Sequence, residues 1–319
     1  MDFINPEVER ATCTSFPSPF FPNTGARRDR NSSGVLPRAS PRTRGGDSVD
    51  RRGRAPDETQ PRIVSGAEPA VIRFLITGHS RGLGAALARE ALARGGAVWG
   101  LARRSLNPPP GVGPERFRET AVDLGDLPRL VRVLEDLDLE TWLAGSAMVV
   151  LINNAGLLGP VGPPERLAAT EIVRAAAVDF VAPLVLTSVF ARATVGLPDR
   201  RVVHVSSGAA RRPLAGWGVY GAVKAGLDHH ARTVAVDAPA GWRIASVAPG
   251  VIDTDMQTEV RGLDPAVFPE RRRFLDLARD GLLVPPEAAA RRFLDHVTSD
   301  VFGREPVIDL RSLGDDPRS

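Results

Sequence analysis

The chain has 319 residues; 43% are hydrophobic and 25% are charged, with 41 basic side chains against 38 acidic ones. This is the composition of a globular protein that is long enough to bury a core without disulfides or a structural metal. A single cysteine, Cys13, excludes an intrachain disulfide framework and a cysteine-rich zinc module, and we expect no metal site. The balanced charge and the interrupted apolar runs predict neither a nucleic-acid partner nor a membrane-spanning helix.

Residues 1–66 differ in composition from the rest of the chain. Prolines recur, short arginine clusters alternate with Ser, Gly and Asp, and no apolar periodicity persists. Such a segment buries too little apolar surface to offset its ordering entropy. We therefore predict a disordered extension over residues 1–66 and one folded domain over residues 67–319. A targeting peptide and a misassigned start codon are two alternative explanations of this segment. Early acidic residues argue against a mitochondrial targeting peptide, and no apolar signal core is visible. We expect a cytoplasmic protein.

From residue 70 onward, short strand-like runs alternate with helical stretches. Strands are predicted at residues 71–77, 97–102, 117–124, 147–152, 201–206, 242–247 and 307–310. Helices are predicted between them, among them residues 85–94 and 217–236. Alternation at this spacing predicts an α/β fold, a doubly wound parallel sheet of about seven strands with helices on both faces.

A glycine-rich turn follows the first predicted strand and reads Thr-Gly-His-Ser-Arg-Gly-Leu-Gly over residues 77–84. Glycine permits unusual φ angles and lets the backbone approach a pyrophosphate, which the N-terminus of the next helix also attracts. The position of the turn within an α/β array favours phosphate binding. For His79 we expect solvent exposure in this loop rather than a contact with phosphate.

Arg103 and Arg104 follow the second predicted strand, where a site that selects NAD usually places an acid. No acid occurs between Val98 and Leu106, and Arg81 in the glycine turn adds a further cation. Guanidinium groups suit a 2′-phosphate through charge-assisted hydrogen bonds. The pattern predicts NADP(H) rather than NAD(H); the alternative is that these arginines are ordinary surface residues.

The single tyrosine of the chain, Tyr220, stands four residues before its single lysine, Lys224, in a predicted helix. Side chains four apart share a helix face, so the two groups can serve one site. A nearby ammonium favours the phenolate, which makes the phenol a usable acid or base. Ser207, at the end of the fifth predicted strand, can hydrogen-bond a substrate carbonyl oxygen.

Six segments in this order resemble the short-chain dehydrogenase/reductase family. They are the glycine turn, Asp123-Leu124, residues 153–156 (Asn-Asn-Ala-Gly), Ser207, the Tyr220–Lys224 pair and residues 249–254 (Pro-Gly-Val-Ile-Asp-Thr). The resemblance covers residues 70 to 310. It implies a Rossmann-type fold and nicotinamide-dependent hydride transfer.

The resemblance also assigns expected roles. Tyr220 is the proton donor or acceptor, Lys224 binds the nicotinamide ribose, and Ser207 orients the carbonyl. Asp123 contacts adenine, Asn154 flanks the adenosine ribose, and Thr254 contacts the carboxamide or a phosphate. The residues expected to contact the cofactor are Gly78, Ser80, Arg81, Gly82, Leu83, Gly84, Arg103, Asp123, Leu124, Asn154, Ala155, Gly156, Tyr220, Lys224, Pro249, Gly250, Ile252 and Thr254.

One position departs from the family pattern. Asp179 occupies the place of the usual catalytic asparagine, and no asparagine follows Asn154 in the chain. An ionised aspartate accepts a hydrogen bond from water but donates none. We therefore expect an active enzyme in which Asp179, counted with Ser207, Tyr220 and Lys224 as catalytic, shifts the pH optimum.

Residues 157–163 and 253–257 resemble those of sepiapterin reductases and bacterial benzil reductases, which are NADPH-dependent reductases of carbonyls and vicinal diketones. Residues 253–283 are expected to close over the substrate. Their apolar side chains either form a wall for a hydrophobic carbonyl compound or anchor a lid helix; they are Val260, Leu263, Val267, Phe268 and Phe274.

The sequence thus predicts an NADPH-dependent reductase of ketones, aldehydes or diketones. The rival hypothesis is a catalytically weak NADP-binding sensor on the same fold, and Asp179 is its only support. An epimerase or dehydratase is disfavoured because the substrate region is short. A homodimer or homotetramer through helices near residues 165–195 and 217–237 is implied by the resemblance, although the same apolar run also suits a helix buried within one chain.

Overall fold

The computed structural model describes residues 71–313. The predicted extension over residues 1–66 and the outer ends of the predicted domain, 67–70 and 314–319, lie outside the described residues.

A parallel sheet forms the centre of the described chain. Its seven strands are β1 (Ile72–Thr77), β2 (Ala97–Ala102), β3 (Phe117–Ala121), β4 (Met148–Asn153), β5 (Arg200–Val205), β6 (Trp242–Ala248) and β7 (Val307–Asp309). They lie in the order β3-β2-β1-β4-β5-β6-β7, and every neighbouring pair is parallel. The predicted doubly wound α/β fold is confirmed. The strands that follow β1 are added on one side of it (β2, β3), and the later strands are added on the other side, beginning with β4. Sheets of this kind bind ligands at the switch point between β1 and β4.

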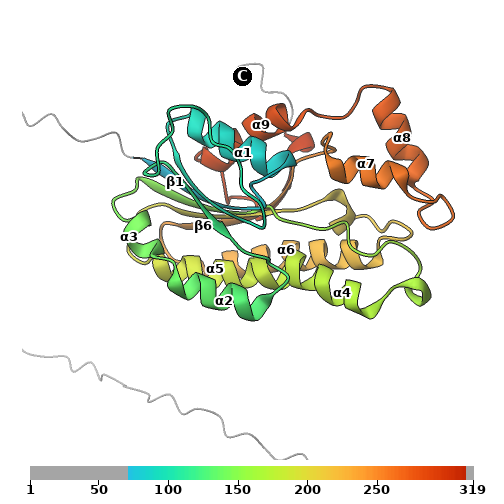
Figure 1. Ribbon diagram of the computed structural model, residues 1–319, viewed down its shortest axis with the longest axis horizontal. Coiled ribbons are helices and arrows are strands. Elements are labelled where there is room, and N and C mark those ends of the chain that lie inside the picture. Colours follow the sequence, from blue (N-terminus) through green and yellow to red (C-terminus); the bar gives the residue numbers. More distant parts are fainter. Residues whose placement is uncertain (1–70, 314–319) are drawn as a thin grey trace, which may run out of the picture. The chain divides into compact units, whose positions relative to one another are not determined.

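Helices cover both faces of the sheet. The α-helices of the described residues are α1 (Gly82–Ala93), α2 (Leu127–Asp136), α3 (Leu139–Leu143), α4 (Ala169–Ala176), α5 (Ala182–Ala193), α6 (Gly218–Val236), α7 (Asp255–Gly262), α8 (Arg271–Arg279) and α9 (Pro286–Thr298). Figure 1 shows α1 and α9 on one face and α2, α5 and α6 on the other, with α7 and α8 at the end of the sheet near α6. The two faces bury separate apolar clusters, one under α1 and α9 and one under α2, α5 and α6.

The third strand differs from its prediction. We expected it to span residues 117–124, but it ends at Ala121. After Val122, whose N–H bonds Ala102 O at 3.0 Å, the chain turns at Asp123, which accepts the Gly125 N–H at 2.9 Å. The last predicted strand residues therefore form a loop at the sheet edge, because the Asp123 side chain stabilises a turn instead of continued pairing.

The run Ala169–Ala193 is continuous helix that includes a π-helical turn, η2 (Ala177–Val181), between α4 and α5. By length and composition it could cross a membrane, contrary to our expectation that no run would pass this test. Its apolarity has another origin, because Val178, Ala182, Leu186 and Phe190 recur every four residues and are buried against the sheet. A stripe at this spacing is one face of a helix.

Phe190 is fully buried in this stripe and packs beside Trp242, with 6.2 Å between ring centroids. Phe190→Ala removes this contact and leaves a cavity, so we expect the free energy of unfolding to fall by about 3–5 kcal/mol. Urea denaturation of the whole chain measures the change. Val195→Ala, at a position that is 77% exposed, is the control and should change it by less than about 0.5 kcal/mol. An equal effect of both substitutions would contradict the packing assigned to α5.

Candidate active site

A cavity of about 490 Å³ opens at the carboxyl ends of the central strands. Nearly all residues that the sequence assigned to the site line it. These are Gly78, Ser80, Arg81, Gly82, Leu83, Gly84, Arg103, Asp123, Leu124, Asn154, Ala155, Gly156, Ser207, Tyr220, Lys224, Pro249, Gly250, Ile252 and Thr254. Of the predicted site residues, Asp179 alone is not among the lining residues. The topology brings these scattered residues together because parallel strands end at the same edge of the sheet.

The glycine turn forms one end of the cavity. Gly78 and Gly82 have φ angles of +66° and +52°, which favour glycine. A Cβ on Gly84 would lie 2.2 Å from Gly78 O, so the first turn of α1 approaches the loop more closely than a side chain permits. The cavity therefore meets bare backbone and the N-terminus of α1, which is a suitable cradle for an anionic pyrophosphate.

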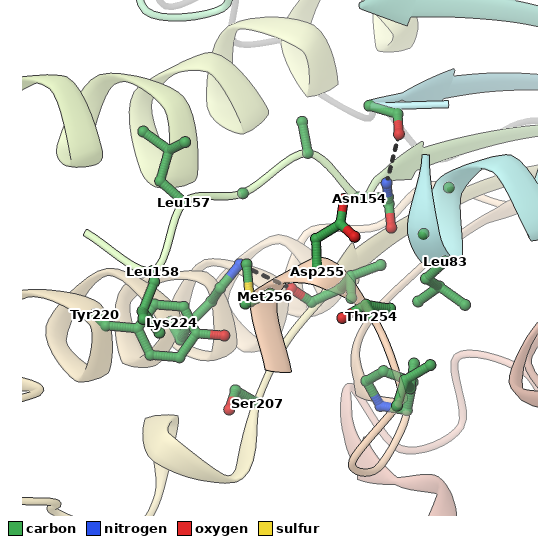
Figure 2. A pocket seen from close by; sticks show the side chains of 18 of the residues that line it. Leu83, Asn154, Leu157, Leu158, Ser207, Tyr220, Lys224, Thr254, Asp255 and Met256 are labelled. Carbon is green, nitrogen blue, oxygen red and sulfur yellow. Dashed lines mark hydrogen bonds between the residues drawn. The ribbon is translucent and has the colours of Figure 1, made fainter. Parts of the chain in front are cut away.

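Asn154 and Thr77 tie this turn to the end of β4. The Thr77 hydroxyl accepts the N–H groups of Asn154 and Ala155 at 2.9 and 3.0 Å, and Asn154 Nδ2 donates to Thr77 O at 2.8 Å. The two loops are held together across the centre of the sheet. Figure 2 shows Asn154 beside Leu83 at this end of the pocket.

Four arginines line the glycine-turn end of the cavity. Arg81, Arg103 and Arg104 are exposed, and Arg81 Nη1 lies 3.1 Å from Asp255 Oδ2. The fourth, Arg174 of α4, was not predicted; its Nη2 lies 3.0 Å from Asp123 Oδ2. No spacing rule links residues this far apart, so only the fold could reveal the pair. Partial burial acts to raise the pKa of Asp123, but the Gly125 N–H, Arg174 and Arg103 outweigh it and lower that pKa.

Tyr220, Lys224 and Ser207 gather at the other end of the cavity (Figure 2). Tyr220 and Lys224 are on α6, 8% and 4% exposed, and Lys224 Nζ lies 5.7 Å from the centre of the Tyr220 ring. Lys224 Nζ donates to Val205 O at 3.2 Å, and Ser207 Oγ accepts the Ala209 N–H at 3.2 Å. The predicted shared helix face is confirmed, and both functional groups border the same space.

Asp179 lies directly behind Lys224 and is fully buried. Its Oδ1 accepts the Leu157 N–H at 2.8 Å, and its Oδ2 is 3.8 Å from Lys224 Nζ. The π-helical turn η2 carries it, and such single turns are frequent at functional sites. Burial outweighs the opposing effects of Lys224 and the Leu157 N–H, and it raises the pKa of Asp179. The contact with Lys224 places this carboxyl group directly behind the cavity.

Two further histidines form a chain behind the site. His204 Nδ1 lies 3.2 Å from Asn153 Nδ2, and His204 Nε2 lies 3.0 Å from His230 Nδ1. Burial first, then His230 and Lys224, lower the pKa of His204 to about 3. His204 is therefore neutral at ordinary pH, and its burial within β5 suits a structural role.

The expectation for His79 is wrong. Its side chain is 1% exposed rather than solvated, and its Nε2 lies 2.5 Å from Glu119 Oε1. His79 is also absent from the lining of the cavity. The reason is steric: Gly100 of β2 has no side chain, and the imidazole occupies the space that a Cβ there would need.

The apolar side chains of residues 253–283 divide between the two predicted roles, a wall of the cavity and an anchor for the segment. Val260 and Phe274 line the cavity, as the wall hypothesis requires. Phe268 lies behind them and stacks on Trp217 at 4.7 Å between centroids, so it anchors the segment instead. Leu263 and Val267 are not lining residues. Trp217, which the sequence analysis missed, lies just before α6. It lines the cavity and also packs against Phe268.

Within residues 71–313 no group of three or more histidine, cysteine or acidic side chains could hold a metal ion. The donors in the cavity are instead backbone groups, hydroxyls, an ammonium and guanidinium groups. This set suits an anionic organic cofactor, and the glycine cradle provides the close approach that its pyrophosphate needs.

The comparison with known proteins agrees with this geometry. Residues 73–263 match the family model for short chain dehydrogenases. A benzil reductase of Bacillus cereus is 31% identical over 244 residues, 74% of this chain and 98% of that protein. Sepiapterin reductase of Bos taurus is 33% identical over 257 residues, 74% and 93% of the two chains. The crystal structure of a short-chain dehydrogenase/reductase from Burkholderia vietnamiensis is 38% identical, with a TM-score of 0.55 over 76% of this chain and 99% of that one.

The chain belongs to the short-chain dehydrogenase/reductase family. It is therefore an oxidoreductase of the class that binds a nicotinamide cofactor, and reduction of a carbonyl group is consistent with its relatives.

Asp179→Asn removes a buried negative charge next to Lys224 and keeps the acceptor for the Leu157 N–H. We expect turnover at the optimum to be retained or raised. With the anion gone, the ammonium favours the phenolate of Tyr220 more strongly, so the alkaline limb of kcat/KM for carbonyl reduction moves to lower pH. Steady-state rates across the pH range measure both effects.

Asp237→Asn is the matched control, because it neutralises an exposed aspartate just after α6, the helix that carries Lys224. It should leave the pH profile unchanged. A complete loss of activity in Asp179→Asn, in a protein that still binds cofactor, would refute the expected tolerance of this position.

Proposed function

We propose that this protein is an NADPH-dependent reductase of a ketone, aldehyde or diketone carbonyl. The observation that carries the proposal is the placement of Tyr220, Lys224 and Ser207 around the cavity that also contains the glycine turn. A proton donor, a cation and a hydroxyl then border the space where a carbonyl would lie. The sequence similarity to benzil and sepiapterin reductases supports the same reaction type.

Each side chain has one task in this reaction. Ser207 hydrogen-bonds the carbonyl oxygen and orients it. Tyr220 donates its phenolic proton to that oxygen as negative charge develops there. Lys224 stabilises the phenolate that results, and Asp179 compensates the buried ammonium. A nicotinamide cofactor, when bound, supplies the hydride.

The preference for NADPH rests on cations at the glycine-turn end of the cavity. Arg103 and Arg104 stand after β2, and Arg81 stands in the turn, all exposed and all lining the cavity. No acidic side chain follows β2 to bind a free 2′-hydroxyl. Guanidinium groups at this position would bind a 2′-phosphate.

The substrate end favours a hydrophobic carbonyl compound. Leu158, Leu214, Trp217, Val260 and Phe274 line the cavity close to the catalytic residues in the fold. Aromatic and aliphatic walls of this kind hold apolar groups on either side of a carbonyl. An aromatic vicinal diketone such as benzil, the compound in the name of one relative, is a suitable first substrate.

We further propose a cytoplasmic homodimer or homotetramer that acts on a small molecule, with neither nucleic acid nor membrane as partner. Helices α4, α5 and α6 occupy the segments where the resemblance places the subunit contacts. Exposed valines on two of these helices, Val173 at 68% and Val236 at 84%, support a contact there.

Replacing Tyr220 by phenylalanine removes only the phenolic hydroxyl. We expect kcat for benzil reduction to fall about 10²- to 10⁴-fold, because a positioned general acid contributes a factor of this size. NADPH oxidation measures the rate, and NADPH affinity, which should be largely kept, is measured by fluorescence.

The same assay separates the enzyme from a nucleotide sensor, the second candidate that Asp179 raises. Wild-type protein that binds NADPH tightly but reduces no member of a carbonyl panel would favour the sensor. Full activity of Tyr220→Phe would instead refute the role of the phenol while leaving the reaction in place.

Arg103→Ala tests the cofactor preference. The lost charge-assisted hydrogen bond should weaken NADPH binding about tenfold or more and leave NADH binding nearly unchanged. Dissociation constants for both cofactors provide the measurement. Arg129→Ala, an exposed arginine at the start of α2, is the control and should alter neither. Equal weakening for both cofactors would argue against a 2′-phosphate contact.

A further inference from the structure

One buried polar cluster lies next to the cavity and has no task in the proposed reaction. His79 of the glycine turn is 1% exposed, and its Nε2 lies 2.5 Å from Glu119 Oε1 on β3. An ionised carboxylate only accepts hydrogen bonds, so Nε2 carries the proton. The other ring nitrogen is buried without a hydrogen-bond partner among the described residues. Glu119 is thus the group that holds the imidazole.

The sheet provides the space for this contact. A Cβ on Gly100, in the middle of β2, would lie 2.4 Å from the His79 ring. Gly100 pairs with Glu119 across the β2–β3 register, so the imidazole crosses over β2 to reach the next strand. Phe117 meets the ring edge-on, with 6.2 Å between centroids. The His79 side chain is therefore packed against β2 and β3, although its backbone belongs to a loop.

The same carboxylate oxygen binds a second segment. Glu119 Oε1 accepts the Leu106 N–H at 2.6 Å, and the Leu106 side chain is 4% exposed in the core. Residues 103–105, which include both arginines after β2, are exposed between this anchor and Ala102. Ala102 is fixed in turn, because its carbonyl accepts the Val122 N–H at 3.0 Å. The arginine segment is short and is held at both ends.

We propose that His79 and Glu119 are positioning residues for cofactor selectivity, because Glu119 Oε1 connects the glycine turn to the arginine segment. This inference rests on the proposed use of NADPH. His79 does not line the cavity, so it acts through the loop it belongs to and not by touching phosphate. With the connection intact, Arg103 and Arg104 keep a fixed distance from the turn that would bind the pyrophosphate. Without it, the arginines lose their place opposite a 2′-phosphate.

Glu119→Ala in the full chain removes both hydrogen bonds at once. We expect the ratio of NADPH to NADH affinity to fall at least fivefold, mostly through weaker NADPH binding. Glu119→Gln keeps an oxygen that accepts from His79 and from Leu106, so it should retain the ratio within about twofold. Dissociation constants for both cofactors, with thermal unfolding of each variant, are the measurements.

Thr120→Ala is the matched control. Thr120 follows Glu119 on β3 and accepts a hydrogen bond from Trp99 Nε1 at 2.9 Å, so its loss also removes one contact between β2 and β3. This hydrogen bond involves neither the glycine turn nor the arginine segment, so its loss should leave the ratio unchanged. If Glu119→Ala and Thr120→Ala weaken both cofactors equally, Glu119 has a structural role only and the proposal is wrong.

His79→Ala removes the same hydrogen bond from the side of the glycine turn. If Glu119→Ala does not fold, this variant by itself tests the positioning role. Its ratio should also fall, and the double variant should be no worse than Glu119→Ala, because the two side chains form one link. Additive losses would overturn the proposal. A wild-type protein that does not prefer NADPH would refute the proposed cofactor itself, whereas a wild-type preference that survives both substitutions refutes only the positioning role.

Discussion

The burial of one ammonium group is the main electrostatic constraint on the candidate active site. Lys224 is 4% exposed, and removing a charge from water is costly unless other groups compensate it. Two groups do so: the Val205 carbonyl, which accepts a hydrogen bond, and the Asp179 carboxylate at 3.8 Å. The phenol of Tyr220 lies one helical turn away on α6 and is exposed to the same local field. The proposed acid, Tyr220, therefore lies beside a buried cation, and both side chains are themselves largely buried.

That arrangement depends on the way the sheet is connected. The chain builds outward from β1 to β3 and then returns to place β4 on the other side of β1. The glycine turn and the Asn154 segment consequently face one another, and the Thr77 hydroxyl ties them together. The catalytic end is contributed by β5 and α6, further along the same edge. A single cavity thus combines the proposed pyrophosphate cradle and the proposed proton donor, which come from opposite halves of the domain.

The replacement of the family's asparagine by Asp179 is understandable in this setting. The π-helical turn places the side chain against the Leu157 N–H and Lys224, and both contacts suit an acceptor. Its second oxygen has no hydrogen-bond partner among the described residues, so the contact with the ammonium is mainly electrostatic. In the proposed reaction, the negative charge of Asp179 opposes the effect of the Lys224 ammonium on the phenol, which is why this position is the one chosen to test the pH response.

Local patterns in the sequence determined the strands, the glycine turn and the Tyr220–Lys224 pair. These features depend on periodicity, on backbone freedom and on a four-residue helical spacing, all of which act between near neighbours. The sequence pattern placed the end of β3 at residue 124, three residues too late. The apolar pattern continues there, but the Asp123 side chain stabilises a turn. The family resemblance placed distant residues such as Asn154 and Tyr220 in one site, but side-chain contacts that no motif covers were decided by the tertiary structure. Burial of His79 against Glu119 needs a missing side chain at Gly100, and the Asp123–Arg174 pair needs α4 to pass beside the end of β3. Contacts of this kind depend on how elements pack, and no local pattern of residues encodes that packing.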